Sequence, residues 1–201
     1  MTNQRVNFDI DIDVANRDLL LEHFKHVNAS IISEDGHIKK HNSGVYFHDI
    51  PKNSKKQSTI DYKNAESRGY FKFDILNVSI YNDIKTEEEM SSLMVEPNWD
   101  NLQNEDFFKK VIHISNHYDV YKKLLEPLDS IPRMAMFLAI IRPGKKHLQN
   151  QTWKDIAKTV WDQPTDGSYA FKKSHSVAYS HLVALHMNLL EKQSNLSSKF
   201  S

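Results

Sequence analysis

The sequence predicts an α+β protein in which a small β-rich lobe precedes a helical lobe. Two observations support this prediction. Apolar residues alternate with acidic ones over 6–14 and with charged ones over 69–81, which is the period of a β-strand. Later in the chain, most segments instead have apolar residues at helical spacing, and five prolines punctuate them.

The first lobe is expected to be a small mixed β-sheet with one clear helix. After the strand at 6–14, residues 16–27 have a helical pattern, with Leu19, Leu20 and Phe24 at helical spacing. Asn16 suits the position before this helix, because its side chain can accept backbone N–H hydrogen bonds. Further strands are expected at 31–32 and 44–50, and the segment 69–81 is expected to be a strand that passes into a helix or turn. A turn is expected at 34–36, a basic loop at 51–58 and a mixed segment at 60–68.

The second lobe is expected to be helical throughout. Its predicted helices are 86–94, 106–117, 118–125, 131–141, 153–161 and 174–192. We therefore predict a β-rich lobe over 1–85, a helical lobe over 86–192 and a disordered tail over 193–201, since the last residues are mostly polar.

Composition limits the classes of protein that this chain can be. Hydrophobic residues make up 39% of the 201 residues and charged residues 26%, so a buried core is possible. There is no long apolar run and no apolar signal segment, so we expect no membrane partner and a cytoplasmic location, the host cytoplasm if the protein is viral. The absence of cysteine excludes disulfides and thiolate metal sites. A net charge of zero counts mildly against a stand-alone nucleic-acid binder.

Three carboxylates are expected on one face of the first strand, because Asp9, Asp11 and Asp13 are each two residues apart. Carboxylate oxygens are the ligands that Mg²⁺ prefers, and two such ions can promote phosphoryl transfer. The alternative is an exposed edge strand whose charges discourage aggregation. The short pattern alone leaves both interpretations open.

Five segments, in order along the chain, resemble motifs of the bacterial DNA polymerase III alpha subunits, the C-family DNA polymerases. The segment 8–14, followed by Asn16-Arg17-Asp18, is similar to the family's acidic palm strand and the helix after it. The others are Lys40-His41-Asn42-Ser43-Gly44-Val45, Gly69-Tyr70-Phe71-Lys72-Phe73-Asp74-Ile75-Leu76, Ala139-Ile140-Ile141-Arg142-Pro143-Gly144 and Tyr169-Ala170-Phe171-Lys172-Lys173-Ser174-His175-Ser176-Val177-Ala178-Tyr179. The last of these is the most specific match.

The resemblance implies a palm-like sheet of the polymerase-beta-like nucleotidyltransferase type, followed by a fingers-like helical lobe. It implies that Asp11, Asp13 and Asp74 are the catalytic carboxylates and the ligands of two Mg²⁺ or Mn²⁺ ions. Asp9 matches the family's non-ligating aspartate.

The resemblance also implies that four basic residues contact substrate phosphates: Lys40, Lys72, Arg142 and Lys173. Two of them have simpler interpretations. Lys72 could neutralise the acidic site, since it alternates to the face of Asp74, and Arg142 could cap a helix end. We expect His41 and His175 to be structural rather than catalytic.

The chain also departs from the family pattern. We expect the Gly-Ser element that holds the incoming triphosphate to be missing, because only a short stretch precedes Phe8. The arginine-rich insertion expected between Gly144 and Lys173 is almost gone.

Three functions remain open. The first is DNA replication by a DNA polymerase-like nucleotidyltransferase that uses a DNA primer-template and deoxynucleoside triphosphates. This enzyme would act alone or as one subunit of a split polymerase, with another polymerase or replisome subunit as partner. The second is a non-catalytic DNA- or replisome-binding module derived from a polymerase. The third is a small metal-dependent nuclease.

Overall fold

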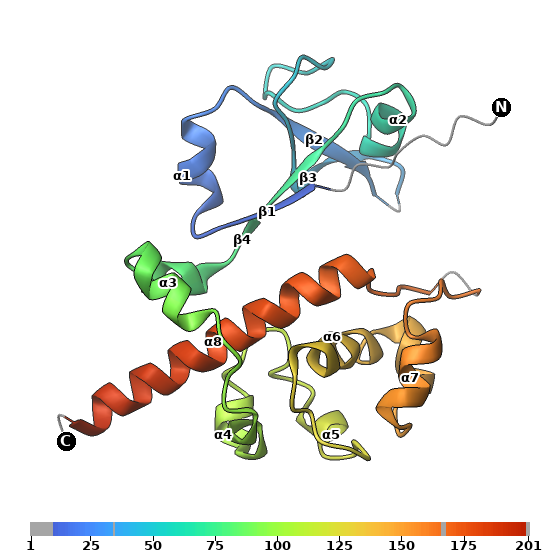
Figure 1. Ribbon diagram of the computed structural model, residues 1–201. Coiled ribbons are helices and arrows are strands. Elements are labelled where there is room, and N and C mark those ends of the chain that lie inside the picture. Colours follow the sequence, from blue (N-terminus) through green and yellow to red (C-terminus); the bar gives the residue numbers. More distant parts are fainter. Residues whose placement is uncertain (1–9, 34, 166–167, 200–201) are drawn as a thin grey trace. The chain divides into compact units, whose positions relative to one another are not determined.

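The four-stranded sheet and the helices of the computed structural model confirm the predicted α+β class (Figure 1). The structure describes residues 10–33, 35–165 and 168–199. The chain divides into two compact units, Met1–Ile84 (unit 1) and Lys85–Ser201 (unit 2). All four strands of the sheet lie in unit 1, whereas the described elements of unit 2 are helical.

The sheet of unit 1 has the order β1-β4-β3-β2. Its strands are β1 (Ile10–Val14), β2 (Val27–Ile32), β3 (Ile38–Tyr46) and β4 (Phe73–Asn77). β4 is a central strand, because it pairs in parallel with β1 and antiparallel with β3. β2 pairs antiparallel with β3 across a bulge. The sheet is therefore mixed, as the alternating segments predicted.

Unit 1 also contains α1 (Arg17–Glu22), α2 (Tyr62–Ser67) and the 3₁₀ helix η1 (Ser79–Asp83). Asn16 caps α1 as predicted, since its side-chain oxygen accepts hydrogen bonds from the Asp18 and Leu19 amides, both at 3.1 Å. The predicted helix 16–27 is too long. Helix α1 ends at Glu22, because Val27 belongs to β2, where it pairs with Tyr46.

The two helices of unit 1 contribute to two different clusters on the sheet. Leu21 of α1 packs with Val45 and Ile75 in one cluster. Ala65 of α2 packs with Tyr46 in another, which also contains Val27, Ala29 and Ile50. Val45 and Tyr46 are consecutive strand residues, so their side chains point to opposite faces. The sheet therefore has an α1 side and an α2 side, and both bury apolar residues.

Unit 2 is built around α6, most of whose side chains are buried. Figure 1 shows α6 running along the long helix α8, and Val183 and Met187 of α8 belong to the same core as Phe137 and Leu138 of α6. Its helices are α3 (Glu87–Leu93), η2 (Trp99–Gln103), α4 (Glu105–Phe108), α5 (Tyr118–Tyr121), α6 (Ile131–Ile140), η3 (Pro143–Leu148), α7 (Trp153–Thr159) and α8 (Lys173–Lys199).

Helix α8 is longer than the sequence predicted. The prediction ended it at Lys192 and made 193–201 a disordered tail, whereas the helix continues to Lys199. Polar composition suggested the tail, but residues 193–199 contain neither glycine nor proline, so nothing in them terminates a helix. No helix in the described ranges is both long and apolar enough to cross a membrane.

His113 is a histidine held neutral within unit 2. Its ring lies 4.4 Å from that of Tyr179, and its Nε2 atom is buried without a hydrogen-bond partner among the described residues. Burial, helped by the nearby charges of Arg142 and His186, lowers the pKa of His113 to about 4. The folded protein therefore keeps the His113 ring neutral at pH values at which the same ring in the unfolded chain binds a proton.

We predict that unit 2 loses stability as the pH falls from about 6.5 to about 4. In this window the unfolded chain binds a proton at His113 and the folded chain does not, so the free energy of unfolding falls by at most about 1.4 kcal/mol per pH unit. Urea unfolding at several pH values measures this slope. The control is His113→Asn, because asparagine tolerates the positive φ of 66° at this position. An equally steep slope in that variant would contradict the assignment.

Candidate metal centre

Asp11, Asp13 and Asp74 lie on the same face of the sheet, which we call the carboxylate face. β1 and β4 are parallel neighbours, and Asp11 is the register partner of Asp74. Asp13 follows Asp11 by two residues along β1, so it projects to the same side. Adjacent strands are about 4.8 Å apart, which brings the three side chains into one neighbourhood. Asp9, the first carboxylate of the motif, lies outside the described residues.

The Asp74 carboxylate is buried and has two close partners. The Ser43 hydroxyl donates a hydrogen bond to its Oδ1 atom at 2.7 Å, and the Lys72 ammonium pairs with its Oδ2 atom. Lys72 stands two residues before Asp74 and therefore shares its face. The side chains of Lys72 and Asp74 are only 17% and 12% exposed, so this ion pair is shielded from water. Lys72 thus neutralises the acidic site in this structure.

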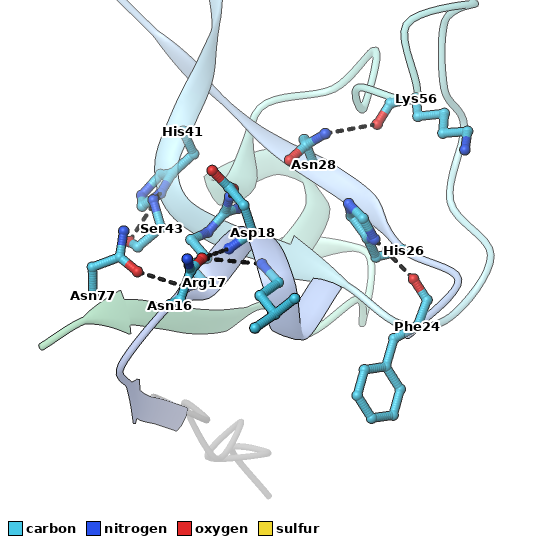
Figure 2. Close-up of polar contacts among 11 residues, drawn as sticks. Asn16, Arg17, Asp18, Phe24, His26, Asn28, His41, Ser43, Lys56 and Asn77 are labelled. Atoms are coloured by element: carbon cyan, nitrogen blue, oxygen red, sulfur yellow. Dashed lines mark hydrogen bonds and ion pairs between the residues drawn. The ribbon is translucent and has the colours of Figure 1, made fainter. Parts of the chain in front are cut away.

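His41 supports this arrangement as a hydrogen-bond acceptor. Its Nδ1 atom accepts the amide hydrogens of Gly44 at 2.9 Å and Ser43 at 3.3 Å (Figure 2 draws His41 and Ser43). Burial and the Lys72 charge lower the pKa of His41, against the opposing effect of Asp74. The 3.7 Å approach of Nδ1 to Asp74 is therefore a contact of a neutral ring and not an ion pair.

Gly44 provides the space that this cluster needs. It is the register partner of Asp74 on the neighbouring strand β3. A Cβ atom at this position would lie 2.6 Å from Cδ of Lys72 and 3.0 Å from both Cβ of Ala29 and Nδ1 of His41. The absence of a side chain at Gly44 therefore leaves room for the stem of Lys72 beside Asp74.

The carboxylates of β1 lie in a different electrostatic environment. Asp11 is exposed and Asp13 is partly buried. Burial and then the negative charge of Asp11 raise the pKa of Asp13, and burial and then the charge of Asp13 raise the pKa of Tyr81. Both shifts indicate negative charge on this strand that a nearby cation would stabilise.

The carboxylate face suits a hard divalent cation in the chemistry of its donors. In their present positions, however, no three His, Cys, Asp or Glu side chains among the described residues are arranged to hold a metal ion. At Asp74, moreover, Lys72 pairs with one of the two carboxylate oxygens. A cation that uses Asp74 must therefore displace the Lys72 ammonium or share the carboxylate with it.

The basic residues expected at phosphates belong to both units. In unit 1, Lys72 is paired with Asp74, and Lys40 is exposed on β3. In unit 2, Arg142 precedes η3, and its guanidinium lies 4.8 Å from the centre of the Phe171 ring. Its Nε atom is buried without a partner within the described segments. Lys173 is exposed at the start of α8.

Arg17 is a charged residue whose environment the sequence did not reveal. Its side chain is only 8% exposed, and its Nε and Nη2 atoms are buried without hydrogen-bond partners in the described part of the chain. Its backbone amide donates to Oδ1 of Asn77 at 2.6 Å, as Figure 2 shows. A signal was present, because Arg17 lies one helical turn before Leu21 and therefore on the buried face of α1.

Ser43 was also missed as a partner of Asp74. The sequence places it in a motif 31 residues away, and only the pairing of β3 with β4 brings the two together. Comparisons with family models, with curated proteins and with solved structures found no match to this chain, so its function has to be inferred from its own residues.

We predict that Gly44→Ala destabilises the protein by about 1–3 kcal/mol, because the added methyl group overpacks the contact with Lys72 and Ala29. Urea unfolding measures the change. The same substitution in a Lys72→Ala background should cost less, since one of the crowded atoms is then gone. Equal costs in the two backgrounds would show that Lys72 is not the group that Gly44 accommodates.

Proposed function

We propose that this chain is a palm-and-fingers protein of the C-family polymerase type that transfers nucleotides to the 3′ end of a DNA primer. It would use two Mg²⁺ or Mn²⁺ ions and act alone or as one subunit of a split polymerase. The observation that supports this most directly is the parallel register of Asp11 with Asp74, with Asp13 two residues further along the same face.

The spatial grouping of the resembling segments also supports the proposal. Three of them lie on β1, β3 and β4, which are consecutive strands in the sheet. The other two meet within unit 2, where the Gly144 amide donates to the Tyr169 carbonyl at 2.9 Å. A Cβ atom at Gly144 would lie 2.8 Å from that carbonyl oxygen, and Arg142 lies against Phe171. The resembling segments were identified from the sequence alone, and within each unit they are also neighbours in space.

Each residue of the carboxylate face has a role in this proposal. Asp11, Asp13 and Asp74 would hold the ions, which stabilise the charge on the attacking and leaving oxygens of the phosphoryl group. Ser43 orients Asp74 through its hydrogen bond to Oδ1. The Lys72 ammonium pairs with Asp74 before the cation binds. Once the cation displaces it, this ammonium would be free to contact a substrate phosphate.

The same ion pair favours a second candidate function. Lys72 already neutralises the Asp74 carboxylate, so this carboxylate needs no metal ion to balance its charge. A protein that kept the polymerase scaffold but lost its chemistry would have such a pair. The second candidate is therefore a non-catalytic module that binds DNA or a replisome subunit. Its DNA or partner binding would be indifferent to Asp74→Asn.

We predict that the purified chain extends a primed DNA template with four deoxynucleoside triphosphates and Mg²⁺ or Mn²⁺. Asp11→Asn and Asp13→Asn should each reduce extension by about 100-fold or more, because each removes a negative ligand without changing the side-chain shape. Primer extension on denaturing gels measures this.

The matched control is Asp83→Asn, which removes an exposed carboxylate from η1 in the same unit and should leave extension unchanged. Extension that survives both strand variants would exclude the proposed site. Absence of extension by a folded wild-type chain would favour the binding module or a missing partner subunit.

We further predict that Lys72→Gln increases the affinity for Mn²⁺ by about tenfold, because the ammonium no longer competes for Asp74. Asp74→Asn should weaken Mn²⁺ binding instead. Isothermal titration calorimetry without nucleotide or DNA measures both. If Lys72→Gln leaves Mn²⁺ affinity unchanged or lowers it, Asp74 is not a cation ligand that Lys72 blocks.

A further inference from the structure

Unit 1 contains a concave pocket of about 860 Å³ beside α1, which we call the α1 pocket. It is bounded by α1, the segment between α1 and β2, the end of β3 and the loop that follows β3. Its charged lining consists of five cationic side chains and three carboxylates, so positive charge dominates. They are Arg17, Lys25, Lys40, Lys52 and Lys56, and Asp18, Glu22 and Asp49. The volume lies within the range of small-molecule sites.

The α1 pocket lies at the end of the sheet: Phe47 and α1 line it from the α1 side, and Val27 and Tyr46, which belong to the α2-side cluster, line it as well. Phe47 lines the pocket, and its ring is 5.2 Å from that of Phe73. Phe73 immediately precedes Asp74 in β4 and packs into the cluster of Leu21, on the α1 side. Consecutive strand residues point to opposite faces, so Asp74 is on the other side. Asp11, Asp13 and Asp74 do not line the pocket, so its lining is distinct from the candidate metal centre, although the charge of Arg17 acts on His41 beside Asp74.

A buried cation in the wall of the pocket is the strongest sign of a ligand. The Arg17 side chain is more than nine-tenths buried, and its Nη1 atom lies 3.4 Å from the exposed carboxylate of Asp18. Nε and Nη2 have no partner among the described residues. A guanidinium is always charged and offers five donors, so burying it without an acceptor is costly. Because Nε and Nη2 are themselves buried, an oxyanion in the pocket would reduce this cost through its negative charge near the guanidinium.

The turn after β3 presents two lysines to the same pocket in a fixed backbone geometry. Lys52 and Ser58 form a bridge, and the Asn53 side chain accepts the amides of Lys55 and Gln57 at 2.9 and 3.1 Å. The carbonyl of Lys56 accepts the Asn28 amide at 2.8 Å, which fastens the turn to β2 (Figure 2 shows Asn28 beside Lys56). The ammonium groups of Lys52 and Lys56 are thus carried by a rigid turn.

Lys56 has a left-handed backbone conformation, with a φ of 56°. Glycine or asparagine normally occupies such a position, and a lysine there is strained. A strained residue held by its surroundings suggests that its side chain is needed, and here that side chain lines the pocket.

Aromatic and polar groups accompany the positive charge. Phe24 is 52% exposed and Phe47 is 37% exposed, and their rings lie 5.8 Å apart in the pocket lining. Nearby, the Oδ1 atom of Asn28 is buried without a donor in the described residues. Exposed aromatic rings beside cations suit a ligand that has both a planar base and phosphate groups.

We propose that the α1 pocket binds a free nucleotide. Arg17, Lys52 and Lys56 contact its phosphates, and Phe24 and Phe47 contact its base. A concave pocket of this volume with one buried guanidinium in its wall suits a small molecule better than a polymer, which would need a longer track of cations. This inference goes beyond the proposed nucleotidyl transfer and does not depend on Asp11, Asp13 or Asp74.

Isothermal titration calorimetry of the full chain with ATP tests the proposal. The buffer contains EDTA, so that metal held by the carboxylate face does not contribute and the two proposals can fail separately. We expect ATP to bind, adenosine to bind at least about tenfold more weakly, and Arg17→Gln to weaken ATP binding by about tenfold or more. Adenosine binding as tightly as ATP would overturn the proposal.

Lys56→Gly separates binding from folding. Glycine adopts the left-handed conformation without strain, so the variant should keep or raise the melting temperature while it weakens ATP binding by about tenfold. The matched control is Lys55→Gln, which removes an exposed charge from the same turn but not from the pocket lining, and ATP affinity should not change.

Three further results would overturn the proposal. ATP could fail to bind to the folded chain. Lys55→Gln could weaken binding as much as Lys56→Gly does, which would indicate diffuse attraction to a basic turn. A short single-stranded oligonucleotide could bind more tightly than ATP and displace it, which would indicate a surface for a nucleic-acid strand and not a nucleotide pocket.

Discussion

The carboxylate of Asp74 places the strongest constraint on unit 1, because it is a charge buried in the central strand of a small sheet. Burying a carboxylate is costly unless a cation and hydrogen-bond donors compensate it. Lys72, just before β4, and Ser43 of β3 do so. Their approach requires Gly44, whose missing side chain leaves room for the lysine stem. One buried charge thus accounts for the residue types at three neighbouring positions.

The two sides of the sheet carry opposite kinds of charge. The α2 side holds the three aspartates, of which Asp11 and Asp13 repel each other. The α1 side holds Arg17, a buried cation, in the wall of a pocket with excess positive charge. Unit 1 therefore has a region that attracts cations and a region that attracts anions. Metal-dependent phosphoryl transfer uses both a cation site and groups that bind phosphate, so the two proposals are compatible although each stands on its own residues.

Unit 2 has a conventional helical core and one polar region where the resembling segments meet. Gly144 contacts the Tyr169 carbonyl so closely that no side chain could replace its hydrogen. Arg142 lies over the Phe171 ring, and its charge also lowers the pKa of His113. The region therefore combines an aromatic face, a cation and a neutral histidine.

The sequence by itself determined which residues share a face and where α3, α6, α7 and α8 lie, whereas the predicted helix 106–117 is wrong beyond Phe108, where α4 ends. The period of a strand is local, so alternation correctly placed Asp11 and Asp13 together, and Asn16 identified the start of α1. Only the tertiary structure decided which strands pair and which side chains contact one another. Three features depend on pairing between strands that are distant in sequence. They are the register of Asp11 with Asp74, the place of Val27 in β2 and the hydrogen bond from Ser43 to Asp74. The helical spacing of Arg17 and Leu21 indicated that Arg17 is on the buried face of α1, but only the packed structure shows that two of its nitrogens are buried without partners among the described residues.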